Sequence, residues 1–497
     1  MSGTKTALVI MARTVVLLLA VTSIWGVAAL LDTRPALAQP SEPSDLTIDD
    51  IYVKTASPDQ NRMDVTWEDN STDETSFEVQ YKTDGTDTWE STELPANSTE
   101  WSHKGVTNAT RYSYQVRACS GSSCSGWAKN TTAEGERYVA AKARPQWDDP
   151  SNFTKLDYGV YWFRCGKCRT NPDGTKTSNG IKADPTDLGT SYYDPDKPTV
   201  IYVHGIQENG KKQRESFVSP TDASDMAAQW KTKGYNVGLF YWNQIADDNG
   251  LPPRIHEGKV WGQWSGKSYW RWRKMDGSFV YMQPTTMANT NTVADLFRDS
   301  YAAALKNQTN PDIRLAAHSM GNQVAIRGTS LLQSSGGSEP MPKRVALLDP
   351  YYSQINNYLT IRPRDEATKF VSQLKGAEVL FEYYKTSAER VIDTVDTIAK
   401  QMAYVKIYPN YTIPNQAAAH GAAVHWYLSS PSYSPPAWDY NSATRKYTRA
   451  GVAPSAAMPD STLQEVNACT TDCKWWTQRN GKYTKVITDD DFVRRMW

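Results

Sequence analysis

The chain has 497 residues, of which 39% are hydrophobic and 22% are charged, and its formal net charge at pH 7 is zero. This length is too great for one small domain, so two or three folded units are expected. The composition is ordinary for a soluble globular protein, and the balanced charge offers no electrostatic basis for binding nucleic acid.

Residues 1–38 have the features of a signal peptide. Lys5 and Arg13 precede an apolar run over residues 15–31, and Ala-Leu-Ala at positions 36–38 supplies the small residues that a signal peptidase requires. We expect cleavage after this motif and a secreted, extracellular product. The alternative is an uncleaved N-terminal membrane anchor, because the apolar run approaches the length that spans a bilayer.

The six cysteines fall in three close pairs, Cys119/Cys124, Cys165/Cys168 and Cys469/Cys473. In an exported protein, close and even pairs predict disulfides. A zinc site made from the four thiolates of two pairs is the alternative, which an oxidising compartment disfavours. The Cys-x-x-Cys spacing at 165–168 also matches a redox motif, but it lacks a surrounding βαβ pattern, so a structural role is expected.

After a Pro/Ser-rich linker at 39–45, residues 46–136 alternate apolar and polar side chains with a period of two. The alternation is clear at Met63, Val65 and Trp67, and it recurs at 77–81 and 112–118. Turn-rich patches separate these runs. Several short alternating strands predict an all-β antiparallel sandwich.

This segment resembles a fibronectin type III domain. The resemblance rests on Trp67 and on the run 105–118, Gly-Val-Thr-Asn-Ala-Thr-Arg-Tyr-Ser-Tyr-Gln-Val-Arg-Ala, with Tyr112 as the corner tyrosine. Asn108-Ala109 replaces the Pro-Gly of the family's corner motif. The resemblance implies a spacer or adhesion module that contacts an extracellular polymer or a cell surface.

Residues 137–198 are irregular and are expected to form a connector that packs on the next domain. The pattern then changes over residues 199–430. Apolar strands are expected at 199–203, 237–241, 313–317 and 345–348, and helices between them at 222–233, 293–306 and 323–332. This alternation predicts an α/β domain, a mostly parallel sheet with helices on both faces. Functional loops then lie at the carboxyl ends of the strands.

Ser319 occupies a turn that is typical of a catalytic nucleophile. The strand at 313–317 ends in His-Ser-Met-Gly, and a helical pattern follows directly. Small residues two before and two after the serine, Ala317 and Gly321, permit the sharp bend that such a serine requires. Because a hydroxyl is unreactive until a base takes its proton, a base, an acid and an oxyanion site are expected nearby.

Two loops supply the expected oxyanion site and acid. His204-Gly205 follows the strand at 199–203, and such a turn aims backbone amides at an oxyanion; the predicted donors are the amides of Ile206 and Met320. His204 itself is expected to brace the loop. Asp349 ends the strand at 345–348 and is the predicted acid; the alternative is a turn-forming Asp-Pro.

The base is sought among only six histidines. His318 adjoins the serine, so its side chain is expected to project away from the turn, while His103 lies in the sandwich and His256 in a polar insertion. Helical spacing after residue 420 places His420 in a loop or first turn and His425 inside the helix. A catalytic histidine belongs on a loop above the sheet, so His420 is the predicted base.

Residues 199–430 resemble the lipase branch of the α/β-hydrolases. The resemblance rests on the order Ser319, Asp349, His420 and on these matches: Ile201-Tyr202-Val203-His204-Gly205, residues 236–242, Ala317-His318-Ser319-Met320-Gly321, Leu348-Asp349-Pro350, and His420 followed by Trp426-Tyr427-x-Ser429. It implies a Ser-His-Asp triad, an acyl-enzyme, and no metal or cofactor. Ala317 departs from the glycine that is usual at its position.

Two insertions and a tail complete the chain. The first insertion, 243–291, carries Trp261, Trp264, Trp270 and Trp272, which we assign as substrate-binding residues of a cap; the alternative is a flap that only packs over the sheet. The second, a helical insertion at 363–402, holds alternative acids at Glu382, Asp393 and Asp396. Residues 431–497 form a C-terminal extension of unassigned role.

The sequence therefore predicts a secreted serine hydrolase that cleaves carboxylic esters, of lipase or esterase type, with an ester or lipid as substrate. One alternative is an extracellular polyester depolymerase or an esterase that acts on polysaccharide. Another is a hydrolase fold without catalysis that serves adhesion or binding.

Overall fold

The computed structural model describes residues 39–497 except for 54–59, 84, 108–109, 130, 133–134, 137–138, 141–154, 171–175, 186–191, 208–214, 220–221, 249–252, 263–269, 275, 282–291, 337–338, 354–356, 388–394 and 472. The expected signal peptide lies outside these residues. Within the described part, no helix has the length and apolar character needed to cross a membrane.

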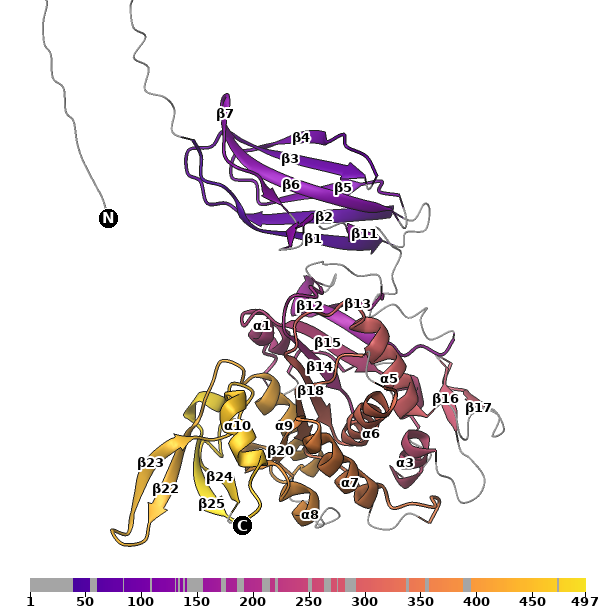
Figure 1. The fold of residues 1–497 in the computed structure, drawn as a ribbon, viewed down its shortest axis with the longest axis vertical. Helices are drawn as coiled ribbons and strands as arrows, with labels where there is room; N and C mark the ends of the chain where they lie inside the picture. Colours follow the sequence, from indigo (N-terminus) through magenta and orange to yellow (C-terminus); the bar gives the residue numbers. More distant parts are fainter. Residues whose placement is uncertain are drawn as a thin grey trace, which may run out of the picture.

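The antiparallel sandwich expected near the N-terminus is present (Figure 1). One sheet contains β1 (Ser44–Val53), β2 (Gln60–Glu68) and β5 (Glu100–Lys104); the other contains β3 (Ser76–Thr83), β4 (Glu90–Pro95), β6 (Arg111–Ser120), β7 (Ser123–Cys124), β8 (Ala128–Lys129) and β11 (Val139–Ala140). Strands β9 (Thr131–Thr132) and β10 (Gly135–Glu136) form a separate ribbon. Alternating side chains such as Val65, Phe77 and Val116 point inward and are buried between the two sheets.

Tyr112 closes the corner of this sandwich. Its hydroxyl accepts a hydrogen bond from the amide of Thr107 at 3.0 Å, which ties the loop before β6 to the strand. The disulfide between Cys119 and Cys124 joins β6 to β7, and a second disulfide joins Cys469 to Cys473. Both pairings are as expected and indicate an oxidising or extracellular environment. The side chains of Cys165 and Cys168 lie outside the described part.

Beyond the sandwich, the described residues include a mixed sheet of twelve strands, in the order β13-β12-β15-β14-β18-β19-β20-β21-β24-β25-β22-β23. The strands from β15 to β24 run parallel. Their bounds are β12 (Gly159–Thr170), β13 (Lys176–Lys182), β14 (Thr199–Val203), β15 (Asn236–Tyr241), β18 (Ile313–His318), β19 (Arg344–Leu348), β20 (Leu380–Lys385), β21 (Ala403–Lys406), β22 (Pro436–Asn441), β23 (Lys446–Val452), β24 (Lys474–Asn480) and β25 (Asp491–Met496).

Helices cover both faces of this sheet. Alternate strand residues enter two separate cores, so that Ile201 and Val203 contact one and Val200 and Tyr202 contact the other. The first core includes residues of α3 (Pro253–Trp261), α5 (Val293–Ala304), α6 (Gly321–Ser334), α7 (Pro363–Gly376) and α8 (Val395–Ala399). The second includes α1 (Met226–Lys231), α9 (Gln416–Leu428) and α10 (Asp460–Asn467).

The sheet is wider than the expected 199–430 range. The presumed connector supplies β12 and β13, and the C-terminal extension supplies β22 to β25. The sequence predicted an irregular connector here because β12 shows no alternation of apolar and polar residues. Its residues Val160, Tyr161, Trp162 and Phe163 are all buried. Both segments are integral parts of the α/β unit.

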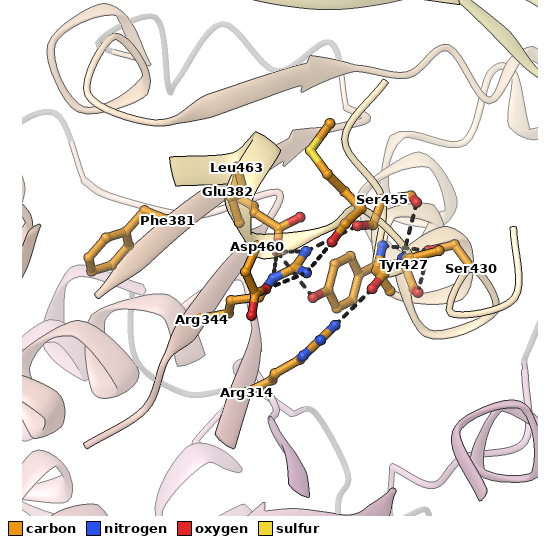
Figure 2. Close-up of polar contacts among 12 residues, drawn as sticks. Arg314, Arg344, Phe381, Glu382, Tyr427, Ser430, Ser455, Asp460 and Leu463 are labelled. Carbon is orange, nitrogen blue, oxygen red and sulfur yellow. Dashed lines mark hydrogen bonds and ion pairs between the residues drawn. The ribbon is translucent and has the colours of Figure 1, made fainter. Parts of the chain in front are cut away.

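A buried arginine, Arg344 of β19, fastens the C-terminal extension to the sheet (Figure 2). Arg344 and Glu382 are both fully buried; the Nε and Nη2 atoms of Arg344 donate to Glu382 Oε1 at 3.0 and 2.7 Å. Arg344 also donates to the carbonyls of Met458 and Ser455 at 2.7 and 3.1 Å. Glu382, one of the alternative acids, thus lies on strand β20 rather than in the expected helix, and its carboxylate is committed to Arg344.

Candidate active site

Ser319 lies at the turn between β18 and α6 with a φ of +54°, a conformation that L-residues rarely adopt. Its amide donates to the carbonyl of Leu348 at 3.1 Å, which holds the turn against β19. Gly321 is required here, because a Cβ atom would lie 2.3 Å from the carbonyl oxygen of Val203. Ala317 is fully buried between β14 and β19, where its methyl group is accommodated without glycine.

The loop after β14 comes close to this turn. A Cβ atom at Gly205 would lie 2.7 Å from Cβ of Ser319, so only glycine lets the loop approach the serine. Among the described hydrogen bonds, neither the amide of Ile206 nor that of Met320 donates to a protein acceptor. Met320 is the N-cap of α6, a position whose amide has no partner within the helix. The role of these two amides as oxyanion donors stays a prediction.

His204 braces this loop. Its Nε2 atom accepts a hydrogen bond from the amide of Trp242 at 3.1 Å, so the proton of the neutral ring lies on Nδ1, which donates to the carbonyl of Gly205 at 2.8 Å. The indole of Trp242 donates to the carbonyl of His204 at 2.9 Å and stacks on its ring. These contacts fix the backbone just before Ile206.

Asp349 follows β19 directly and is fully buried. Its Oδ2 atom lies 2.7 Å from Nδ1 of His420 and accepts from the amide of Ser387 at 3.1 Å, while its Oδ1 atom accepts from Nζ of Lys385 at 2.8 Å. Burial alone would raise the pKa of Asp349, but the hydrogen bond with His420 and the charge of Lys385 hold it well below the ordinary value. The carboxylate is therefore ionised and fully hydrogen-bonded.

His420 lies in the second turn of α9, not in a loop or first turn as expected. The helix begins earlier because Asn415 caps it, its side chain accepting from the amide of Ala418 at 3.0 Å, and because the alanines that follow favour helix. The side chain of His420 is 22% exposed. Among the described contacts, no hydrogen bond joins its ring to the hydroxyl of Ser319; such bonds are often long before substrate binds.

His318 packs against His420 instead of projecting away from the site. The two ring centroids lie 4.5 Å apart, and Nε2 of His318 donates to the carbonyl of His420 at 3.2 Å. Burial lowers the pKa of His318 to about 3, with a smaller contribution from the charge of His420. His318 therefore remains neutral at ordinary pH and supports His420.

The first insertion packs tightly against the sheet. Trp261 and Trp270 are 1% and 2% exposed; the indole of Trp261 donates to Gln323 at 2.7 Å and its ring stacks on Phe370. Trp272 is also buried, whereas Trp264 lies outside the described residues. This burial favours a packing role for these tryptophans. Their direct contact with a substrate stays a prediction.

A buried ion cluster holds the insertion together. Lys259 is fully buried and donates to Asp248 at 2.9 Å, and Arg271 on β16 (Arg271–Arg273) donates to both oxygens of the same carboxylate. Strand β17 (Phe279–Tyr281) pairs with β16, and α2 (Asn243–Ala246) begins the insertion. The described part of this segment thus packs over the sheet, as the alternative of a packing flap predicts, and its role as a cap stays a prediction.

Comparison with known proteins finds similarity to β-sandwich domains over a small part of the chain. No protein-family model matches the chain, and no curated protein matches it. Among solved structures, the FN5 domain of Drosophila Lar matches 21% of this chain and 98% of its own at 14% identity and a TM-score of 0.16. An FN3 domain of human collagen XX matches 19% and 96% at 13% identity and a TM-score of 0.14, and a redesigned β-sandwich protein matches 20% and 90% at 13% identity and 0.17. These weak similarities concern a fibronectin-type sandwich over about a fifth of the chain and bear on no activity.

Proposed function

We propose that the α/β part of this protein is a serine hydrolase that cleaves carboxylic esters. The observation that carries the proposal is the ionised Asp349 carboxylate 2.7 Å from Nδ1 of His420, with Ser319 held at a positive φ in the turn after the neighbouring strand β18. The serine and the acid directly follow β18 and β19, and the histidine lies on α9, which is the chain order of the α/β-hydrolases. The parallel strands β14, β18 and β19 bring their carboxyl ends together at this point.

The sheet supports the expectation of an α/β-hydrolase. In its central order β15-β14-β18-β19-β20-β21, the chain passes from β14 to β15 in one direction and from β18 to β21 in the other, so the strand order reverses once, between β14 and β18. The strand–serine–helix turn lies next to that reversal, where ligands bind in open parallel sheets.

The mechanism follows from the hydrogen bonds of His420. Its Nδ1–H donates to Asp349, so Nε2 carries the free lone pair and takes the proton of Ser319 as the serine oxygen attacks the ester carbonyl. The amides of Ile206 and Met320 bind the oxyanion, and one such donor is worth about 10²–10³ in rate. His420 then protonates the departing alcohol, and water hydrolyses the acyl-enzyme by the reverse proton transfers.

The test is turnover of soluble p-nitrophenyl esters by the full chain. We expect kcat to fall at least about 10³-fold in S319A and in H420A. In D349N it should fall about 10⁴-fold, because the amide replaces the carboxylate that sets the tautomer of His420. Ser330, a half-buried serine on the same helix α6, gives the matched control S330A, which should retain wild-type kcat.

Unchanged turnover in S319A would rule out the proposed nucleophile. Activity on emulsified long-chain esters, compared with soluble short ones, then separates lipase from esterase.

A further inference from the structure

Lys385 contacts the carboxylate of the proposed triad through the oxygen that His420 does not contact. Its Nζ atom donates to Oδ1 of Asp349 at 2.8 Å and to Oγ of Ser387 at 2.9 Å, and its side chain is 8% exposed. The amide of Ser387 donates to the other carboxylate oxygen at 3.1 Å. The ammonium and the imidazole thus share one buried carboxylate, each on its own oxygen.

The end of strand β20 delivers this lysine. Phe381, Tyr383 and Lys385 alternate on one face of the strand, and the first two are buried in the core beneath it. The amide of Asp349 donates to the carbonyl of Tyr384 at 2.7 Å, so the two strand ends are joined by backbone as well as by the ion pair. The position of the ammonium is therefore fixed by the sheet.

The titratable groups around His420 come from several elements. They are Asp349 after β19, Lys385 on β20, His318 on β18, Glu215 in the loop after β14, and His425 on α9 itself. His318 is neutral, as described above. Burial raises the pKa of Glu215, whose carboxyl also accepts from the hydroxyl of Tyr202 at 2.6 Å. His425 is engaged with Ser219. Lys385 is thus the cation that contacts the carboxylate facing His420.

We infer that Lys385 is a positioning residue of the proposed active site: it holds one oxygen of Asp349 and partly neutralises the charge that Asp349 presents to His420. The inference rests on the proposed function, because the charge on Asp349 affects turnover only if His420 acts as the base.

The consequence is a site that works at lower pH than a lone carboxylate–histidine pair would allow. A nearby cation disfavours the imidazolium form of His420, whereas Asp349 favours it. With Lys385 present, His420 loses its proton at a lower pH and becomes able to accept one from Ser319. Removal of the ammonium should therefore move the acid limb of the activity profile upward.

The experiment compares the pH dependence of kcat/KM for a soluble ester in wild type, K385M, K385R and K406M. We expect the midpoint of the acid limb to rise by about one pH unit in K385M, so that kcat/KM falls about tenfold on that limb and less at high pH. K385R, which keeps the charge, should restore the wild-type midpoint. Lys406 lies on β21, in register with Lys385 of β20, but its ammonium lies over the ring of Tyr408. K406M should therefore match wild type.

An equal loss of kcat/KM at every pH in K385M, with an unchanged midpoint, would overturn the inference, because it would indicate a role in stability alone. If K385M does not fold, K385Q replaces it with the same expected shift.

A second measurement separates this inference from the proposed function. NMR titration of the His420 ring in S319A and in S319A/K385M needs no turnover, and the midpoint should be higher in the double variant. Wild type without esterase activity would contradict the proposed function while this titration still tests Lys385; identical midpoints would contradict the inference even in an active enzyme.

Discussion

Gly205 lies directly against Ser319: a Cβ atom added at Gly205 would stand 2.7 Å from Cβ and 3.3 Å from Oγ of the serine, and 3.1 Å from the carbonyl of His318. The loop that carries Ile206 can reach the serine only because residue 205 has no side chain. The proposed oxyanion site therefore depends on a steric relationship between two loops that are distant in sequence.

The substitution G205A should displace this loop and lower kcat by about 10²-fold, the size of one lost oxyanion donor. Gly421 provides the control, since it lies beside His420 in α9 and a Cβ there meets no atom within 4 Å. G421A should keep activity and stabilise the helix by up to about 1 kcal/mol. Full kcat in G205A would show that the loop is not part of the site.

The substitution H204F should loosen the same loop by a different route. A phenyl ring keeps the stacking on Trp242 but cannot accept from its amide or donate to the carbonyl of Gly205. We expect kcat to fall roughly 10- to 100-fold, about as much as for other lost supporting contacts, with KM little changed. If KM rose while kcat held, His204 would act on substrate binding instead.

Loss of the buried ion pair should destabilise the α/β unit. R344M leaves the carboxylate of Glu382 buried without its cation, which costs about 3–5 kcal/mol. The double variant R344M/E382M should recover much of that loss, because neither charge remains. Urea unfolding measures both, and R364M, which breaks a surface pair with Asp365, should change stability by less than about 1 kcal/mol. Equal stability of R344M and R364M would contradict this account.

Asp490 should give the protein an unusual dependence of stability on pH. Burial raises its pKa to about 7, despite hydrogen bonds from Trp426 and Gln478. Because the folded state binds the proton more tightly than the unfolded chain, Asp490 favours folding at low pH, and this contribution is lost as pH rises from about 4 through 7.

The slope that Asp490 contributes is at most about 1.4 kcal/mol per pH unit. The free energy of unfolding of D490N, relative to wild type, should therefore increase between pH 4 and 8. A constant difference across that range would mean that Asp490 is ionised throughout.

Much of the proposed site could be read from local patterns. The turn at Ser319 needs small flanking residues, the acid stands where a buried strand ends, and both are properties of a few neighbouring residues. The sandwich could also be predicted from a local pattern, since the alternation at Met63, Val65 and Trp67 reflects one buried face of a strand.

Other features depend on contacts between distant residues and leave no local signal. In the sequence, Lys385 cannot be told from a surface lysine at the end of a strand. It reaches Asp349 because β19 and β20 are neighbours in the sheet. Strand β12 is buried on both faces, so its sequence shows no alternation of apolar and polar residues. Glu382 was predicted to lie in a helix because nothing near it in the sequence shows its partner, Arg344, which is 38 residues away. His420 was placed too early in its helix because alanines before it extend α9 toward the N-terminus.

The most direct measurement of the central claim is the site of reaction with a fluorophosphonate, which phosphonylates an activated serine. After reaction of the full chain at neutral pH, peptide mass spectrometry should find a single adduct on Ser319, absent in S319A and strongly reduced in H420A. Folded protein that carries no adduct, or an adduct on another serine with Ser319 unmodified, would contradict the assignment of Ser319, His420 and Asp349 as a catalytic triad.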